Sequence, residues 1–241
     1  METRIPRLLV VDDEPDICDN LSDIFTELSY RVDIAHNGQE ALKLVDLNQY
    51  DVALLDLKMP GMNGLELYRE IRRRSVDTVA IVVTANANSD MARSALHSGA
   101  WRIMPKPLDL KQLLTHVDEA LSQPLVLVVD DDHDLCQSLW DLFREHGYRA
   151  GMAHDVDDVR DRLRQRSYRV VLIDMKLPDG NGTEVLRMVR SENPEARALI
   201  ITGHVDIDAL VQQALASGAD AVCYKPFNVE ELLKTIRSLA G

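Results

Sequence analysis

The chain has 241 residues, of which 46% are hydrophobic and 28% are charged, and its formal net charge is −13 at pH 7. This length allows one large domain or two of ordinary size, and the composition excludes a disordered or membrane-embedded chain. The acidic balance argues against a nucleic-acid surface, and no apolar run approaches the roughly 18 residues that a membrane-spanning helix needs. The three cysteines show no metal-ligand spacing and the N-terminus has no signal-peptide pattern, so we expect reduced thiols and a cytoplasmic location.

The first half of the chain alternates short apolar runs with amphipathic stretches. Strands are predicted at 7–11, 31–35, 51–55, 79–83 and 101–104. Helices are predicted between and after them, at 15–28, 38–47, 64–74, 89–98 and 109–121. Pro15 suits the first turn of a helix, and Gly99 falls where a helix should stop. The alternation is typical of a parallel sheet that is covered by helices on both faces.

The second half of the chain repeats the first. The segment LLVVDDE at 8–14 returns as VLVVDDD at 126–132, and the same offset carries Asp56 onto Asp174. Further along, the offset grows by one residue, which a loop can absorb. A period of this length indicates a duplicated domain, since solenoid repeats run about 20–50 residues. We therefore predict two domains of one fold, residues 1–122 and 123–241, joined at Ser122-Gln123-Pro124.

Acidic residues follow the predicted strands at matching places in both copies. Each copy has a pair of aspartates after the first strand and one at the end of the third: Asp12, Asp13 and Asp56, then Asp130, Asp131 and Asp174. Residues at the carboxyl ends of parallel strands converge on one edge of the sheet, where three carboxylates repel one another unless a cation neutralises them. A hard divalent cation with oxygen ligands meets that need, so we predict a Mg²⁺ site in each copy. The alternative, that these are ordinary loop and cap residues, is disfavoured because the whole set recurs.

A hydroxyl and an ammonium group accompany the carboxylates. Thr84 and Thr202 end the fourth strand of each copy, and Lys106 and Lys225 follow the fifth. The hydroxyl can donate to a phosphoryl oxygen, and the lysine carries a compact charge for an anion. A carboxylate beside Mg²⁺, an ammonium and a hydroxyl is arranged to accept a phosphoryl group in line and to form an acyl phosphate.

Both halves of the chain resemble the receiver domains of two-component response regulators. The resemblance rests on VVDD at 10–13 and 128–131, DLKMPGMNG at 56–64 with DMKLPDGNG at 174–182, Thr84-Ala85 with Thr202-Gly203, and Lys106-Pro107 with Lys225-Pro226. It implies an α/β fold, with two flavodoxin-like (βα)5 doubly wound parallel-sheet domains in tandem and the strand order 2-1-3-4-5. It also implies transfer of a phosphoryl group from a histidine kinase or a histidine phosphotransfer protein to Asp56 and Asp174. The aspartate sets would bind Mg²⁺, helped by the backbone carbonyls of Lys58 and Lys176.

Two features depart from the pattern of the family. Receivers usually carry Tyr or Phe three residues before the lysine, and here Ile103 and Val222 stand at these positions. We therefore expect phosphorylation to act through the loop and helix after the fourth strand instead of through a rotating aromatic side chain. His204 lies two residues beyond Thr202, where the first copy has Asn86, and this difference predicts unequal phosphoryl lifetimes. A solvated loop histidine is the alternative.

Three functions of other classes fit the sequence less well. A Mg²⁺ phosphohydrolase of the haloacid dehalogenase type carries Asp-x-Asp after its first strand, whereas this chain has adjacent aspartates and a distant acceptor. A flavodoxin needs a phosphate-binding loop at that place, and the acidic segment 12–14 would repel the phosphate. A scaffold without signalling chemistry is the third, and it requires that phosphorylation change nothing.

The sequence carries no recognisable output motif, such as a helix-turn-helix, an ATPase loop or a kinase motif. We therefore expect phosphorelay signalling through protein contacts, with no enzymatic activity beyond self-phosphorylation and slow autodephosphorylation. The alternative is that the chain is the regulatory receiver portion of a larger hybrid histidine kinase or effector protein. The expected partners are the phosphodonor, a downstream effector and a second copy of the chain in a homodimer, without direct contact to nucleic acid or membrane.

Overall fold

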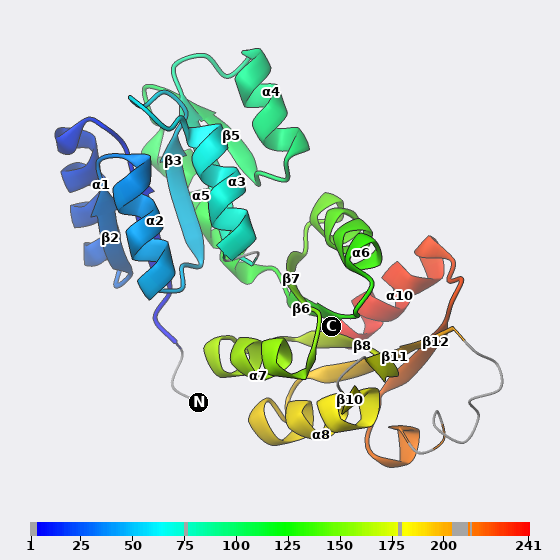
Figure 1. The fold of residues 1–241 in the computed structure, drawn as a ribbon. Helices are drawn as coiled ribbons and strands as arrows, with labels where there is room; N and C mark the ends of the chain where they lie inside the picture. The colour runs from blue at the N-terminus through cyan, green and yellow to red at the C-terminus, as the bar shows by residue number, and fades with distance from the viewer. Residues whose placement is uncertain (1–3, 75–76, 178–179, 204–211, 213) are drawn as a thin grey trace. The chain divides into compact units, whose positions relative to one another are not determined.

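The computed structural model describes the chain apart from residues 1–3, 75–76, 178–179, 204–211 and 213. The chain divides into two compact units, Met1–Gln123 and Pro124–Gly241. Each unit contains a five-stranded sheet flanked by helices (Figure 1). Among the described residues, no helix combines the length and the apolar character that crossing a bilayer requires.

The first unit is a parallel sheet whose strands alternate with helices along the chain. Its strands are β1 (Arg7–Val11), β2 (Arg31–Ala35), β3 (Val52–Asp56), β4 (Val79–Thr84) and β5 (Arg102–Pro105). Its helices are α1 (Pro15–Glu27), α2 (Gly38–Leu47), α3 (Gly64–Arg74), α4 (Asp90–His97) and α5 (Leu110–Ser122). The strands pair in parallel in the order β2-β1-β3-β4-β5. Each of these elements lies within one residue of its predicted bounds.

The second unit has the same topology. Its sheet contains β6 (Leu125–Val129), β7 (Arg149–Ala153), β8 (Val170–Asp174), β11 (Arg197–Thr202) and β12 (Ala221–Tyr224), paired in the order β7-β6-β8-β11-β12. Its helices include α6 (His133–Glu145), α7 (Val156–Gln165), α8 (Gly182–Glu192) and α10 (Val229–Ala240). A short antiparallel pair that was not predicted, β9 (Lys176–Leu177) with β10 (Gly180–Asn181), follows β8. The predicted fold class, two flavodoxin-like doubly wound α/β domains, is confirmed.

Both faces of the sheets are buried, which is why the strands read as nearly continuous apolar runs. In β1, Leu9 and Val11 face one core cluster, while Leu8 and Val10 face another. The first cluster contains side chains of α2, α3 and α4, and the second contains side chains of α1 and α5. All residues of β3 are buried. Helices on both sides therefore fix the central strands, and with them the residues at the strand ends.

The helix after the third strand begins against the last residue of that strand. The Gly64 N–H donates to the Leu57 carbonyl over 3.1 Å, and a Cβ added at Gly64 would overlap the carbonyl oxygen of Asp56. In the second unit, a Cβ on Gly182 would lie 2.6 Å from the carbonyl oxygen of Asp174. Only glycine permits so close an approach of two backbones. These two glycines therefore set how closely α3 and α8 pack on the ends of β3 and β8.

We expect Gly64→Ala to lower the free energy of unfolding of the first unit by about 2–3 kcal/mol, because the backbone must shift to admit the methyl group. Gly182→Ala should do the same to the second unit. Urea unfolding of variants that keep only Trp101, in the first unit, or only Trp140, in the second, measures both. Arg69→Ala, an exposed change in α3, is the control and should have an effect below about 0.5 kcal/mol. Equal stability of the G64A and R69A proteins would contradict this account.

Candidate functional site

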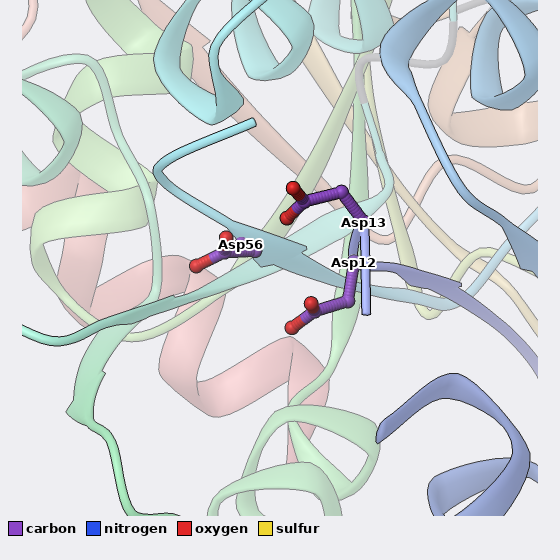
Figure 2. A group of neighbouring side chains, drawn as sticks. All are labelled: Asp12, Asp13 and Asp56. Atoms are coloured by element: carbon purple, nitrogen blue, oxygen red, sulfur yellow. The ribbon is translucent and has the colours of Figure 1, made fainter. Parts of the chain in front are cut away.

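Three carboxylates of the first unit meet where strands β1 and β3 end. Asp12 and Asp13 follow β1, and Asp56 is the last residue of β3 (Figure 2). Oxygen atoms of the three carboxylates lie within 4.8 Å of one another. Asp12 and Asp56 are buried, with 3% and 5% of their surface exposed, whereas Asp13 is exposed. The ends of two adjacent strands thus concentrate acidic groups at one edge of the sheet.

Hydrogen bonds from neighbouring elements hold Asp12 in place. Its N–H donates to the Ala35 carbonyl over 3.2 Å, next to the last residue pair of β1 and β2. Its carboxylate accepts the Glu14 N–H over 3.0 Å, and its carbonyl accepts the Cys18 thiol over 3.3 Å. Burial raises the pKa of the Cys18 thiol to about 11, so the sulfur keeps the proton that it donates. Strand pairing and helix α1 together fix the direction of the Asp12 side chain.

Lys106 brings a positive charge to these carboxylates from the end of β5. Its N–H donates to the Thr84 carbonyl over 2.8 Å, so strand pairing positions the residue. The Nζ atom lies 2.8 Å from a carboxylate oxygen of Asp12, 3.5 Å from one of Asp56 and 3.4 Å from one of Glu14. Burial lowers the pKa of Lys106, but the hydrogen bond and charge of Asp12, together with the charge of Asp56 and a hydrogen bond to Glu14, outweigh it, and the net pKa lies above the ordinary value. The lysine therefore stays charged at neutral pH.

The second unit repeats the cluster with Asp130, Asp131 and Asp174, whose carboxylate oxygens also lie within 4.8 Å of one another. Asp130 and Asp174 are buried, and Asp131 is exposed. Lys225 donates to both buried carboxylates, over 2.6 Å to Asp130 and 2.8 Å to Asp174. The Cys136 thiol donates to the Asp130 carbonyl over 3.3 Å, in the same way as its counterpart in the first unit. The two clusters therefore share one framework.

Burial is the main influence on the pKa of one aspartate in each cluster, Asp56 in the first and Asp130 in the second. It raises the pKa of Asp56; the adjacent charge of Lys106 and the backbone N–H of Lys58 oppose this, and the charge of Asp12 adds to it. Burial likewise raises the pKa of Asp130. A carboxylate with a raised pKa is one that its surroundings do not fully compensate when it is ionised. Each cluster can therefore accommodate a further cation.

Thr84 and Thr202, at the ends of β4 and β11, are each 1% exposed. The Thr84 hydroxyl oxygen accepts the Asn86 N–H over 3.2 Å, which leaves the hydroxyl proton available for another acceptor. In the second unit Gly203 follows the threonine, and among the described residues the nearest atom to a Cβ added there would be the Cβ of Lys225, at 4.0 Å. The second lysine therefore lies close to the end of the fourth strand of its unit.

In each unit the structure brings the three predicted aspartates and the predicted lysine together. These residues are Asp12, Asp13, Asp56 and Lys106 in the first unit and Asp130, Asp131, Asp174 and Lys225 in the second. Lys58 and Lys176 bond to the third aspartate of their units through their backbone N–H groups, and the role expected of their carbonyls stays a prediction. Ile103 and Val222 pack against core clusters. His204 lies outside the described residues.

Several contacts at the two sites were not predicted. Among them are the thiol hydrogen bonds from α1 and α6, for which the recurrence of Cys18 as Cys136 was the available signal. In the second unit the His133 ring lies against the His154 ring, with centroids 3.8 Å apart. His154 Nδ1 also lies 3.1 Å from the Asp130 carbonyl oxygen. Nothing in the sequence relates the two histidines, because one begins a helix and the other follows a distant strand.

Comparison of the sequence with models of known protein families shows to which family the two units belong. A model of the response regulator receiver domain matches residues 8–118 and, a second time, residues 126–237. The chain belongs to the response regulator receiver family. The resemblance stated from the motifs is thereby confirmed for both halves, and each compact unit contains one receiver match.

Proteins of different lengths contain segments that are similar to these receivers. A response regulator receiver protein of Anaeromyxobacter sp. is 32% identical over 233 residues, which are 97% of this chain and 94% of that protein. The regulatory protein AtoC of Escherichia coli is 38% identical over 119 residues, which are 49% of this chain and 26% of AtoC. The solved structure of response regulator protein TrrA from Thermotoga maritima, in complex with Mg²⁺-BeF, is 37% identical. It covers 48% of this chain and 99% of TrrA, with a TM-score of 0.43.

Removal of the lysine should destabilise each receiver in the absence of metal ions, because it leaves buried carboxylates without a positive partner. We expect Lys225→Met to lower the free energy of unfolding by about 3 kcal/mol and Lys106→Met by about 2 kcal/mol, since Lys225 makes two short contacts and Lys106 one. Urea unfolding in EDTA measures both losses. Lys111→Met and Lys234→Met, at exposed positions of α5 and α10, are the matched controls. A larger loss for K106M than for K225M would contradict the reported contacts.

Proposed function

We propose that each receiver accepts a phosphoryl group from a phosphohistidine donor onto an aspartate, Asp56 in the first receiver and Asp174 in the second, with Mg²⁺ as cofactor. The observation that carries the proposal is the recurrence of three converging carboxylates with a lysine and a buried threonine at the strand ends. Membership of the receiver family supports the same assignment. In this proposal the receivers span residues 1–122 and 123–241.

The donor set fits Mg²⁺. This ion takes oxygen ligands in octahedral geometry at about 2.0–2.1 Å, so that opposite ligands lie about 4 Å apart. The carboxylate oxygens of Asp12, Asp13 and Asp56 lie within 4.8 Å of one another, and small adjustments would bring them to one ion. The backbone carbonyl of Lys58 and waters are proposed to complete the set. The corresponding ligands of the second receiver are Asp130, Asp131, Asp174 and the carbonyl of Lys176.

The transfer step forms one bond and breaks one. A carboxylate oxygen of Asp56 or Asp174 attacks the phosphorus atom in line with the phosphorus–nitrogen bond of the donor. The electron pair of the broken bond returns to the imidazole of the donor, which takes up a proton, and an acyl phosphate is left on the aspartate. Bound Mg²⁺ would stabilise the negative charge on the phosphoryl oxygens. The burial of both acceptors limits the access of competing water.

The lysines and threonines complete the proposed mechanism. Lys106 and Lys225 would exchange a carboxylate partner for a phosphoryl oxygen, which keeps their charge compensated. Thr84 and Thr202 would donate their hydroxyl protons to another phosphoryl oxygen. Both kinds of group are held by strand pairing, since the lysine N–H donates to the threonine carbonyl over 2.8 Å in the first receiver and 2.7 Å in the second. A donor array fixed in advance of the reaction is what stabilises a transferring phosphoryl group.

The proposed phosphodonor is a histidine kinase or a histidine phosphotransfer protein in the cytoplasm. The output is proposed to be contact with a downstream protein. A second candidate is regulation of a larger hybrid histidine kinase or effector protein in which these receivers are one part. The observation that favours it is that the chain spans only 26% of AtoC, so receivers of this family occur within much longer proteins.

Phosphotransfer from a phosphorylated histidine kinase or from acetyl phosphate tests the proposal. Intact-protein mass spectrometry should find one phosphoryl group per receiver in the wild type, one in D56N or D174N, and none in the double variant, because asparagine cannot form the acyl phosphate. EDTA should abolish all labelling. Asp19→Asn, at an exposed position of α1, is the control and should label like the wild type. Labelling of the double variant would refute the assignment of the acceptors.

Phosphorylation should alter the segments after the fourth strands, because Ile103 and Val222 pack against core clusters and offer no aromatic ring that could rotate. We expect amide exchange in Mg²⁺ to differ with and without beryllofluoride in peptides covering 86–98 and 204–217. The D56N/D174N protein is the control and should not respond. Unchanged exchange in both segments of the wild type would rule out this route of signalling.

A further inference from the structure

The residue that follows the paired aspartates differs between the two receivers. It is Glu14 in the first and Asp132 in the second. Both residues are the N-cap of the next helix, α1 or α6, and both donate their own N–H to the first aspartate of the site over 3.0 Å. The backbones are therefore equivalent, and any difference between the two positions arises from the side chains.

Asp132 uses its carboxylate to cap α6. One carboxylate oxygen accepts the N–H groups of Asp134 and Leu135, both over 3.0 Å. Aspartate is among the favoured N-cap residues because its short side chain reaches these groups. The negative charge of Asp132 is thereby compensated by the amides and by the positive end of the helix dipole.

Glu14 directs its carboxylate to a different partner. The first turn of α1 is fully described, and the Glu14 side chain makes no capping hydrogen bond in it. Pro15 occupies the first helical position there, and glutamate is not among the favoured N-cap residues. The Glu14 carboxylate lies 3.4 Å from Lys106 Nζ instead. It thus adds a fourth acidic group beside the three of the first site.

The two lysines are engaged differently. Lys225 lies 2.6 and 2.8 Å from the two buried aspartates of its site and so forms a short ion pair with each. Lys106 has one contact this short, 2.8 Å to Asp12, and lies 3.5 Å from Asp56. A cation that enters the second site must displace two short lysine contacts, whereas a cation that enters the first displaces one. The lysine that it displaces in the first site also keeps a carboxylate partner, Glu14.

We propose that the first receiver binds Mg²⁺ more tightly than the second, and that Glu14 is the positioning residue responsible. The inference rests on the proposed function and deepens it. Glu14 acts through its own charge and by giving Lys106 an alternative partner, and it need not bind the ion itself. At limiting Mg²⁺ the first receiver therefore becomes competent for phosphoryl transfer before the second.

An NMR titration of the full chain with MgCl₂ measures both sites in one sample. The amides of Glu14 and Asp132 bond to the first aspartate of their sites and report on each receiver separately. We expect the dissociation constant of the first receiver to be about three- to fivefold lower than that of the second. The difference is limited by solvent screening, since the Glu14 side chain is 65% exposed.

Variants at the two cap positions test the cause. Glu14→Gln should weaken Mg²⁺ binding at the first receiver by about three- to fivefold and leave the second unchanged. In the exchange pair, Glu14→Asp should cap α1 and weaken the first site, while Asp132→Glu should release its carboxylate toward Lys225 and strengthen the second. Asp19→Asn removes an exposed charge from α1 and should change neither affinity by more than about twofold. Spectra without Mg²⁺ establish that each variant is folded.

The outcomes separate this inference from the proposed function. Equal affinities in the wild type, or an E14Q protein that binds Mg²⁺ like the wild type, would overturn the role of Glu14 and leave the phosphoacceptor proposal intact. Equal weakening by E14Q and D19N would assign the effect to net charge and would also overturn that role. Absence of Mg²⁺-dependent shifts at both sites would overturn the metal site itself, and the inference with it.

Discussion

Repulsion between buried carboxylates is the constraint on which the rest of each receiver depends. The central strands β1 and β3 are parallel neighbours with both faces covered, so their ends bring Asp12 and Asp56 to one place and bury both. Two buried negative charges at this separation destabilise the fold unless a cation lies between them. In the chain alone that charge comes from Lys106, which follows β5. The hydrogen bond from the Lys106 N–H to the Thr84 carbonyl at the end of β4 positions the residue, and its side chain contacts Asp12 and Asp56.

The two receivers share some structural features and differ in others. Strand order, the thiol under the first aspartate and the close approach of a glycine to the backbone of the third aspartate occur in both receivers. Among the described residues, the differences include the residue after the paired aspartates, the β9–β10 pair and the adjacent rings of His133 and His154. Each lies beside the acidic cluster and leaves the sheet unchanged. The same framework can therefore support two sites with unequal electrostatics.

Periodicity and the repeat allowed most of the fold and the site to be predicted. Strand ends follow from apolar runs, and aspartates directly after such runs must meet at one edge of a parallel sheet. Side-chain partners could not be predicted in the same way. Glu14 and Asp132 occupy equivalent positions, yet their carboxylates have different partners. Glu14, which is one methylene group longer and is followed by Pro15, contacts a lysine, whereas Asp132 caps the next helix. Which side chain the free carboxylate contacts depends on distances between elements of the folded unit, and the periodicity of the sequence does not encode these distances.

The buried thiols beside the two sites determine how readily the protein is oxidised or alkylated there. Cys18 and Cys136 are both 0% exposed, and burial raises the pKa of the first thiol to about 11 and of the second to about 12. Oxidants and alkylating reagents attack the thiolate, which these side chains hardly form at neutral pH. The carbonyls of Asp12 and Asp130 therefore keep their sulfur donors under oxidative stress. The hydrogen bonds that hold both aspartate clusters therefore do not depend on the redox state of the surroundings.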